Sequence, residues 1–463
     1  MPDDRFNFDD KKVLIMGLGR FGGGVDCAEF ASRAGAKVIV TDSAPPEKLS
    51  DSIDKLKEFP NIEFHLGSHD PDDFRDADII IANPAVPSDN EFLEIARKNN
   101  KFVTSQVNIF FELCPAQIIG ITGANGKSTT TALTAHLLRG MMDERREMRD
   151  VWLSGNIGNQ PLLTILDKIK TNDLVVLELS SFQLEQLAQI QKAPNVALLT
   201  NLTPNHLDRH VTFENYCLAK ENIFKHQNLN DKSPAISIFN AEDKIAAEWY
   251  EKYNKVSGPQ GAGRIYIKYS ANDVSKEIRD NFKLPGRANL SNLAAAIAIS
   301  RHFGINDEQI KKSLPEFKSL PHRLEFVAEI NGVSWYNDSI ATTPQSAIVA
   351  LEAFEQPKII IAGGYDKNLP FDELGKKIAV SAKATVLLGQ TAPKIASTIK
   401  LSPQADTKIQ TVSSLAEAVQ SANQLAEPGD VVLLSPACAS YDMFENFQQR
   451  GQEFIKLVRE LNN

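Results

Sequence analysis

Several classes of protein are excluded by what this sequence has little of. Four cysteines among 463 residues, Cys27, Cys114, Cys217 and Cys438, lie far apart, without the paired spacing of a disulfide framework or a zinc site. Basic charge is in deficit, because 50 Lys and Arg face 59 Asp and Glu and leave a net charge of −9. We therefore expect reduced thiols and no nucleic-acid partner, since a global basic footprint is missing.

Long hydrophobic runs are missing as well. No segment approaches the ~18 consecutive apolar residues that a membrane span requires, so we expect no membrane partner. The first residues, MPDDRFNFDDKK, are too acidic for a secretory signal. Hydrophobic residues make up 42% and charged residues 24%, which is typical of a globular protein. Together these features predict a cytoplasmic protein.

Strand and helix patterns alternate along the chain, which predicts an α/β fold with largely parallel sheets. Short apolar runs end in turn residues at KVLIMG, AKVIVTD, ADIIIANPAVP, AQIIGITG, LVVLELSS, VALLTNLT, VSWYNDS, PKIIIAGG, ATVLLG and DVVLLSPA. Residues 232–283 have a mixed pattern that predicts several short strands, and residues 289–302 predict a helix that Gly304 stops. At ~150 residues per domain the length predicts three domains. We place them at 1–105 (Rossmann-like), 106–319 (a central domain with a mainly parallel sheet) and 320–463 (Rossmann-like).

A glycine-rich turn follows the first strand. Gly17, Gly19 and Gly22 open a helix, and Asp42 ends the next strand, as in a dinucleotide-binding fingerprint. Glycines there let the backbone approach a pyrophosphate at a helix N-terminus. The pattern predicts that a diphosphate or nucleotide docks here without identifying the base, and a purely structural glycine turn is the alternative.

A second glycine-rich loop, GANGKST at residues 123–129, lies between the strand IIGIT and a helical run. Its N–H groups suit triphosphate oxygens, Lys127 adds a positive charge, and the Ser128 hydroxyl is placed for Mg²⁺. Ile121 stands where the first glycine of a standard P-loop would be. We interpret the segment as the P-loop of the central domain and expect it to bind ATP.

Three polar residues further along the chain are candidates for metal chemistry. Glu178 ends a buried strand, where the magnesium partner of a P-loop sheet belongs; a solvated glutamate is the weaker alternative. His206 follows the next strand, although a lone histidine is more often structural. The pattern around Lys220, in the amphipathic segment ENYCLAKENIF, by itself indicates a surface lysine.

Strand-end loops of the third domain carry further polar residues. They are LPHR at 320–323, YNDS at 336–339, GGYDK at 363–367 and SPACAS at 435–440. Loops at the carboxyl ends of parallel strands share one sheet edge, where α/β proteins bind ligands. Cys438 has no base paired with it, so a small buried residue is favoured over a nucleophile.

In combination, these motifs resemble those of the Mur ligases over nearly the full chain and in the same order. The resemblance is closest to the branch that adds glutamate to UDP-N-acetylmuramoyl-L-alanine. It implies an ATP-dependent amide ligase of peptidoglycan precursor synthesis that adds D-glutamate through an acyl phosphate. The motifs that carry it are GLGRFGGG, NPAVP, ITGANGKST, GNIG, ELSSFQLE, NHLDRH, LPHR, NDS with ATTP, GGYDK and LSPACASYDMFENFQQRG.

The resemblance also implies roles for individual residues. Catalysis would fall to Lys127, Glu178, His206 and Lys220. The UDP-substrate would contact Gly19, Arg20, Phe21, Asp42, Ser43, Asn156, Ser180, Gln183 and His206. ATP would contact Gly123, Asn125, Gly126, Lys127, Ser128, Thr129, Asn289, Asn292, Arg323 and Asp338. Glutamate would contact Thr342, Lys367, Ser440 and Phe447. Two Mg²⁺ ions would be held by Ser128, Glu178, His206 and a carbamylated Lys220.

The sequence departs from the family pattern in two respects, at three positions. Ile340 stands where glutamate-adding members often carry a lysine, which leaves D- and L-glutamate both open. Ala44 and Ala85 are small at the expected UDP site. A polyglutamate-type ligase, an NAD-dependent oxidoreductase and a non-catalytic nucleotide sensor are the alternative functions. The oxidoreductase would explain Gly17 to Asp42 but leave ELSSFQLE without a role. We expect a monomer whose partners are small-molecule substrates.

Overall fold

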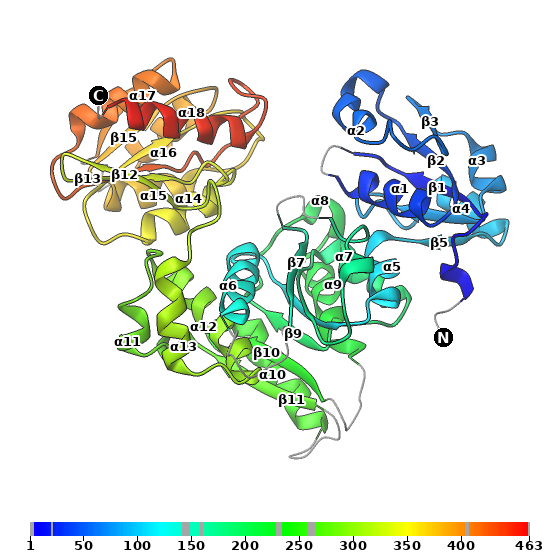
Figure 1. Cartoon of the computed structure of the whole chain (residues 1–463). Helices are drawn as coiled ribbons and strands as arrows, with labels where there is room; N and C mark the ends of the chain where they lie inside the picture. The colour runs from blue at the N-terminus through cyan, green and yellow to red at the C-terminus, as the bar shows by residue number, and fades with distance from the viewer. Residues whose placement is uncertain are drawn as a thin grey trace. The chain divides into compact units, whose positions relative to one another are not determined.

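The computed structural model of the chain describes residues 4–19, 22–140, 149–157, 161–227, 234–257, 264–402 and 407–461. Within those ranges the strands form three sheets (Figure 1). The chain divides into two compact units: residues 1–273 with 294–313, and residues 274–293 with 314–463. The predicted α/β class with largely parallel sheets is confirmed.

The N-terminal region of the first unit is a parallel sheet with the order β3-β2-β1-β4-β5. Its buried strands β1 and β4 have continuous apolar runs, as a parallel sheet covered on both faces requires. Its strands are β1 (Lys12–Met16), β2 (Lys37–Asp42), β3 (Ile62–Leu66), β4 (Ile79–Ala82) and β5 (Phe102–Thr104). Its helices are α1 (Gly23–Arg33), α2 (Ser50–Asp54), α3 (Pro71–Asp76) and α4 (Glu91–Lys98).

The central region of the same unit has the order β11-β10-β9-β6-β8-β7, with every neighbouring pair parallel. The strands are β6 (Gln117–Thr122), β7 (Val151–Gly155), β8 (Leu174–Glu178), β9 (Val196–Leu199), β10 (Ala235–Asn240) and β11 (Arg264–Tyr269). The helices are α5 (Gln106–Leu113), α6 (Lys127–Arg139), α7 (Ser181–Gln189), α8 (Leu207–His210), α9 (Phe213–Lys225), α10 (Lys244–Ser257), α12 (Arg287–His302) and α13 (Asp307–Ser313). Helix α12 begins in the second unit and ends in the first.

The second unit, which we call the C-terminal unit, has the order β12-β13-β17-β14-β15-β16, in which β12 pairs antiparallel at the edge. The strands are β12 (Glu325–Ile330), β13 (Val333–Asn337), β14 (Lys358–Ala362), β15 (Ala384–Leu387), β16 (Lys408–Thr411) and β17 (Val431–Leu434). The helices are α11 (Lys276–Arg279), α14 (Pro344–Glu352), α15 (Asp372–Ser381), α16 (Ala392–Lys400), α17 (Leu415–Leu425) and α18 (Phe447–Glu460).

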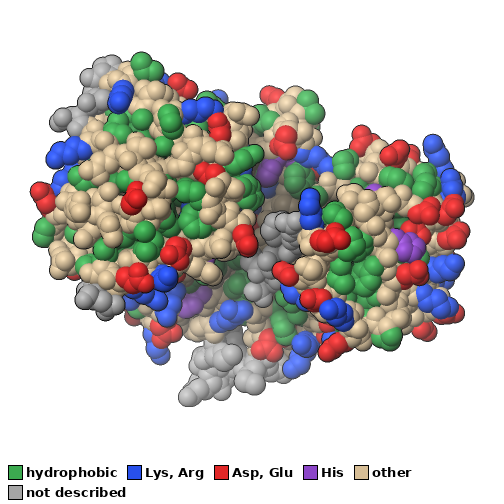
Figure 2. All heavy atoms as spheres, turned by 90° about the horizontal axis from the view of Figure 1, so that it is seen from above, with side chains coloured by type: hydrophobic (Ala, Val, Ile, Leu, Met, Phe, Trp, Pro, Cys, Tyr) green, Lys and Arg blue, Asp and Glu red, His purple; other side chains and the backbone are tan. Residues whose placement is uncertain are grey.

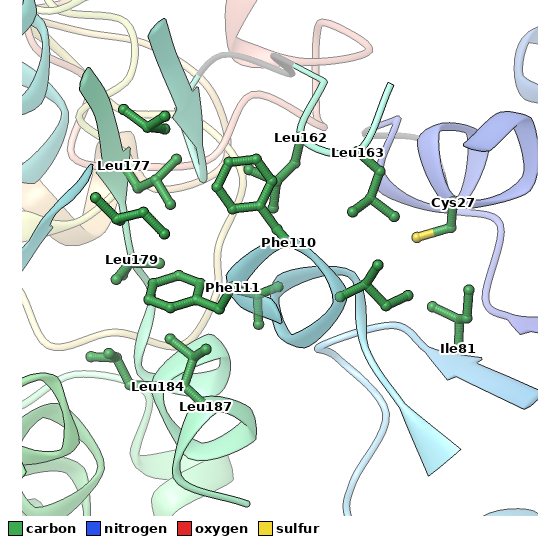
Figure 3. Close-up of a cluster of buried hydrophobic side chains, with 14 of the residues drawn as sticks. Cys27, Ile81, Phe110, Phe111, Leu162, Leu163, Leu177, Leu179, Leu184 and Leu187 are labelled. Atoms are coloured by element: carbon green, nitrogen blue, oxygen red, sulfur yellow. The ribbon is translucent and has the colours of Figure 1, made fainter. Parts of the chain in front are cut away.

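One hydrophobic core joins the N-terminal and central regions through α5. Figure 3 shows Phe110 and Phe111 of α5 between leucines of β8 and α7 on one side and Cys27 and Ile81 on the other. Phe110 is fully buried, and Leu162 and Leu163 are buried in the same cluster. Full burial of a large apolar side chain contributes roughly 1.5–3 kcal/mol, so this packing stabilises the junction between the two sheets.

Residues 232–283 form the short strands β10 and β11, as the mixed pattern predicts, and also the long helix α10 between them, which it does not predict. The helix predicted at 289–302 is confirmed as α12, which begins at Arg287.

Basic and acidic side chains are interspersed over the face seen in Figure 2. None of the helices described here is long and apolar enough to cross a membrane.

Candidate active site

The P-loop lies at the carboxyl end of β6 and is held in shape by the end of β9. Asn201 accepts the Ala124 N–H at 2.8 Å through its backbone oxygen and the Asn125 N–H at 2.9 Å through its side chain. The Thr200 hydroxyl donates to the Asn125 carbonyl at 2.6 Å. Gly123 has φ +149°, and a Cβ there would lie 1.9 Å from the Thr200 hydroxyl, so a side chain does not fit. The loop is thus fixed before a phosphate arrives.

Gly126 and Lys127 complete the loop. Gly126 caps α6 in the left-handed region at φ 80°, which leaves the helix N–H groups directed at the loop. The Lys127 ammonium donates to the Ala124 carbonyl at 2.8 Å. Ser128 is half-buried in the first turn of α6, and Thr129 behind it is buried. The arrangement can bind a triphosphate.

Glu178, at the end of β8, is the buried carboxylate of this sheet edge, with 2% of its surface exposed. Its Oε1 accepts from the Asn156 amide at 3.2 Å, whereas its Oε2 is buried without a hydrogen-bond partner. A buried carboxylate oxygen without a partner is costly, and a cation would satisfy it. Glycine at position 155 lets the end of β7 lie close to Glu178, because a Cβ there would be 2.4 Å from the Glu178 carbonyl oxygen. The site therefore fits a divalent ion.

Lys220 of α9 is buried rather than at the surface, contrary to what its local pattern indicates. Only 2% of the residue is exposed, and its ammonium donates to the Thr122 hydroxyl at 2.9 Å. Burial, followed by the charge of Lys127, lowers the pKa of Lys220 well below its usual value, and Glu178 opposes the shift. The amine therefore lies beside the P-loop strand in a state that favours the uncharged form.

His206 lies before α8 with a left-handed backbone at φ 51°, which is uncommon for a residue other than glycine. Its ring meets the Phe182 ring edge-on at 5.3 Å. Partial burial of the ring and the charges of Lys220 and Lys127 lower the pKa of His206. The neutral imidazole that results can bind a metal.

No cluster of three or more His, Cys, Asp and Glu side chains is placed to hold a metal by itself in the described ranges. The predicted set relies instead on a hydroxyl, one carboxylate, one imidazole and a modified lysine. The charges of Lys127 and Glu178 act on Lys220, and those of both lysines act on His206, so Lys127, Glu178, His206 and Lys220 lie within electrostatic reach of one another.

Ser180 and Gln183, predicted to contact the UDP-substrate, bond each other. They form a capping box at the start of α7: the Gln183 N–H donates to Ser180 Oγ at 3.2 Å, and the Ser180 N–H donates to Gln183 Oε1 at 2.9 Å. The segment between them and β8 carries Leu179, which is fully buried. The motif therefore fixes the chain directly after Glu178.

The glycine-rich turn after β1 is held by Asp42. Its Oδ2 accepts the Gly19 N–H at 3.1 Å and its Oδ1 accepts the Ala44 N–H at 2.9 Å. Ser43 is exposed beside it. Arg20 and Phe21 lie outside the described residues. Each carboxylate oxygen thus accepts one backbone N–H group, so Asp42 shapes this turn and keeps acceptor capacity for a ligand.

In the C-terminal unit, Asp338 is a buried carboxyl at the end of β13. It accepts from the Ser435 hydroxyl at 2.8 Å and from the Leu324 N–H at 3.1 Å. Burial raises the pKa of Asp338 to about 7, although these hydrogen bonds and the Arg323 charge act against the rise. Arg323 Nε is buried without a partner. Asn289 and Asn292 are buried one turn apart on α12, and the Asn292 amide donates to Asn289 Oδ1 at 3.4 Å.

The predicted glutamate residues come from three loops of the same unit. Arg450 of α18, 2% exposed, joins two of them, donating to the Ser339 carbonyl at 2.9 Å and the Cys438 carbonyl at 3.1 Å. This places the loop of Thr342 beside the loop of Ser440. Burial lowers the pKa of Arg450 to about 10. Phe447 begins α18 and its carbonyl accepts from the Ser339 hydroxyl at 2.7 Å, whereas Lys367 is exposed.

Two supporting residues escaped the sequence analysis. Asn201 shapes the P-loop, and no local pattern marks it. Arg450 organises the C-terminal loops, and its place near the end of the motif LSPACASYDMFENFQQRG is the one signal that could have found it. Cys438 is 3% exposed, and burial raises the pKa of its thiol to about 11, which confirms the small buried residue.

Comparison with known proteins agrees with this architecture. Residues 11–105 match the model of the Mur ligase MurD-like N-terminal domain, residues 121–300 the Mur ligase middle domain, and residues 322–438 the Mur ligase glutamate ligase domain. The UDP-N-acetylmuramoylalanine–D-glutamate ligase of Roseiflexus sp. (strain RS-1) is 39% identical, covering 97% of this chain and 98% of that protein. The protein of the same name from Acetivibrio thermocellus is 37% identical, covering 100% and 99%.

Solved structures share the fold. UDP-N-acetylmuramate-alanine ligase MurC from Thermotoga maritima superposes with a TM-score of 0.59 at 20% identity, covering 97% of this chain and 100% of that one. MurF from Acinetobacter baumannii gives a TM-score of 0.56 at 15% identity, covering 98% and 93%. With full-length relatives at this level of identity and matches to all three domain models, the chain belongs to the Mur ligase family.

Proposed function

We propose that this chain is an ATP-dependent ligase that joins D-glutamate to UDP-N-acetylmuramoyl-L-alanine in peptidoglycan precursor synthesis. The observation that carries the proposal is the similarity, at 39% identity over 97% of the chain, to a relative named for this reaction. The P-loop, the unpartnered Glu178 oxygen and the buried Lys220 beside them supply a site that suits it.

The reaction we propose activates a carboxylate. A carboxylate oxygen of the acceptor attacks the γ-phosphorus of ATP, ADP leaves, and an acyl phosphate forms. The glutamate amine then attacks the acyl carbon, the amine loses a proton, and inorganic phosphate leaves from the tetrahedral intermediate. No covalent enzyme intermediate is needed, so the protein contributes positioning and charge neutralisation. Lys127 would offset the repulsion between carboxylate and triphosphate.

Mg²⁺, when bound, neutralises charge on the phosphates and the attacking carboxylate. We propose Ser128 and Glu178 for one ion, and His206 with a carbamylated Lys220 for a second. The Glu178 oxygen without a partner supports the first assignment. Lys220 supports the second, because an uncharged amine adds to CO₂, loses a proton and becomes a carboxylate-like oxygen ligand. Labelling with ¹³C-bicarbonate should give a carbamate carbon signal by NMR that Lys220→Ala lacks.

The substrate subsites follow the same assignment. We propose that residues 1–105 bind the UDP group at the turn of Gly19, Arg20, Phe21, Asp42 and Ser43, with Asn156, Ser180, Gln183 and His206 nearer the sugar. Residues 106–319 would bind the phosphates of ATP, and Asn289, Asn292, Arg323 and Asp338 its adenosine. Residues 320–463 would bind glutamate through Thr342, Lys367, Ser440 and Phe447. One chain supplies every residue, so we propose a monomer, acting in the cytoplasm where its nucleotide substrates are made.

The experiment is phosphate release from ATP and Mg²⁺ with UDP-N-acetylmuramoyl-L-alanine, adding D-glutamate or L-glutamate in parallel. Release that depends on D-glutamate is expected. Release with neither enantiomer would contradict the proposal. Lys127→Ala is the control: it should be inactive while its circular dichroism spectrum stays that of the wild type.

A second candidate keeps the mechanism and changes the amino acid. Ile340, half-buried in the loop between Asp338 and Thr342, stands where other glutamate-adding members often carry a lysine. An apolar side chain there removes a cation from the proposed glutamate site. Release with L-glutamate alone would move the chain to that branch.

A further inference from the structure

Asp26 is a buried carboxylate that the proposed chemistry does not use. It lies on the first turns of α1, directly after the glycine-rich turn, and 5% of the residue is exposed. A carboxylate in such a place is costly unless it is fully hydrogen-bonded. Its partners therefore show what it does.

Among the described residues, the hydrogen-bond partners of the Asp26 carboxylate lie outside its own sheet region. Its Oδ2 accepts the backbone N–H groups of Leu162 and Leu163 at 2.9 and 2.7 Å, and its Oδ1 accepts the N–H and hydroxyl of Thr164 at 3.0 and 2.7 Å. The Gln106 amide, in the first turn of α5, donates to Oδ2 at 2.7 Å. One residue of the N-terminal region thus holds a segment of the central region 136 to 138 positions further along the chain.

The segment that Asp26 holds is bonded in turn to β7, the strand directly before Asn156. The carbonyl of Pro161, directly before Leu162, accepts from the hydroxyl of Ser154 in β7 at 2.6 Å. Asn156 in turn donates to Glu178 at 3.2 Å. In Figure 3, Leu162 and Leu163 lie beside Phe110 of α5, with Cys27, the neighbour of Asp26, also at this junction.

We propose that Asp26 is a positioning residue that fixes residues 161–164 of the central region, and through Ser154 the end of β7 before Asn156, against the start of α1 in the N-terminal region. The inference rests on the proposed function, in which one UDP-sugar contacts both the glycine-rich turn and Asn156. Asp26 lies on α1 directly after the turn, and residues 162–164 are joined through Pro161 to the strand before Asn156. Without the carboxylate, residues 162–164 and α1 can move relative to each other, so binding of the acceptor must order them at a cost in free energy. ATP, held by the P-loop, is unaffected.

A matched control is available in Asp173, which is 2% exposed. It accepts three donors, the Asp150 N–H at 3.1 Å, the Lys170 N–H at 2.9 Å and the Trp152 indole at 2.9 Å. These donors all belong to the central region. Asp173→Asn therefore disturbs a buried carboxylate network while leaving the hydrogen bonds between Asp26 and residues 162–164 in place.

The experiment compares Asp26→Asn, Asp173→Asn and the wild type in steady-state phosphate release, varying acceptor and ATP separately. Asp26→Asn should raise the KM for UDP-N-acetylmuramoyl-L-alanine roughly tenfold or more, with kcat and the KM for ATP within about threefold of the wild type. Asp173→Asn should leave the acceptor KM within about twofold. An unchanged acceptor KM in Asp26→Asn, or an equal rise in Asp173→Asn, would overturn the proposal.

A milder variant and a second measurement keep the proposal testable if Asp26→Asn does not fold. Thr164→Val removes one of the bonds to Asp26 and keeps its N–H, and should raise the acceptor KM by about threefold. Hydrogen exchange at the amides of residues 162–164 should be faster in Asp26→Asn than in Asp173→Asn; equal rates would contradict the coupling. A wild type that releases phosphate with neither glutamate enantiomer would instead refute the proposed function, and this inference with it.

Discussion

Asp338 offers the sharpest test of the buried charges in the C-terminal unit. Burial raises its pKa to about 7, from the ~3.9 of an unfolded chain. Between these pH values the folded protein keeps the proton and the unfolded chain releases it, so the free energy of unfolding falls as the pH rises from ~4 to ~7. At about 1.4 kcal/mol per pKa unit, the three units amount to about 4 kcal/mol.

Asp338→Asn should remove this fall in the free energy of unfolding with rising pH. The amide has the shape of the protonated acid, and its oxygen and nitrogen can meet the Leu324 N–H and the Ser435 hydroxyl. The variant and the wild type should therefore be similarly stable near pH 4, and the variant more stable by up to about 4 kcal/mol near pH 8.

The assay is urea unfolding followed by the fluorescence of Trp335, which is fully buried in β13 of the same unit. A Trp152→Phe, Trp249→Phe background makes it the sole reporter, because the chain has 3 tryptophans. Differences between Asp338→Asn and wild type cancel the other titrating groups. A stability difference that stays constant from pH 4 to pH 8 would refute the reasoning.

Three further predictions follow from single residues. Gly155→Ala should lower the free energy of unfolding by about 1–3 kcal/mol and reduce activity, because φ is +92° and the new Cβ would meet the Glu178 carbonyl. The control Gly304→Ala, at φ +84° with open space around it, should keep its activity. Lys220→Ala should lose about 10²-fold or more of kcat, with partial rescue by acetate or formate; a variant that is active without rescue would contradict the carbamate. Arg450→Met removes the guanidinium donor to the Ser339 and Cys438 carbonyls, while the Ala439 carbonyl keeps the Tyr365 N–H, and it should lower the unfolding free energy of the C-terminal unit by about 3 kcal/mol or more. An unfolding free energy equal to that of the wild type, measured by Trp335 fluorescence in urea, would contradict this prediction.

The sequence predicts those parts of the fold whose signal is local. Buried parallel strands such as β8 and β14 carry uninterrupted apolar runs, so their ends, and Glu178 with them, follow from the pattern. Edge strand β16 has a largely exposed pattern and gives no such signal. Helix α10 was hidden by Trp249, Tyr250 and Tyr253, which favour strands locally but pack here against the hydrophobic core.

The site residues divide in the same way. The P-loop and Glu178 follow from motif and strand position, whereas the burial of Lys220 depends on Thr122, 98 positions away. The roles of Asp26 and Arg450 likewise depend on hydrogen-bond partners more than a hundred residues away along the chain. Resemblance to a family pointed to Lys220. Only the folded chain brings Asp26 to residues 162–164, because no local pattern encodes a contact of that range.

The central claim is that this chain activates the acceptor carboxylate by phosphorylation, and transfer of oxygen tests it most directly. UDP-N-acetylmuramoyl-L-alanine labelled with ¹⁸O in both carboxylate oxygens would be incubated with ATP, Mg²⁺ and D-glutamate. Mass spectrometry of the released phosphate should find one ¹⁸O atom per phosphate, with the other retained in the new amide. Released phosphate without label would contradict attack of the carboxylate on ATP, and with it the acyl phosphate.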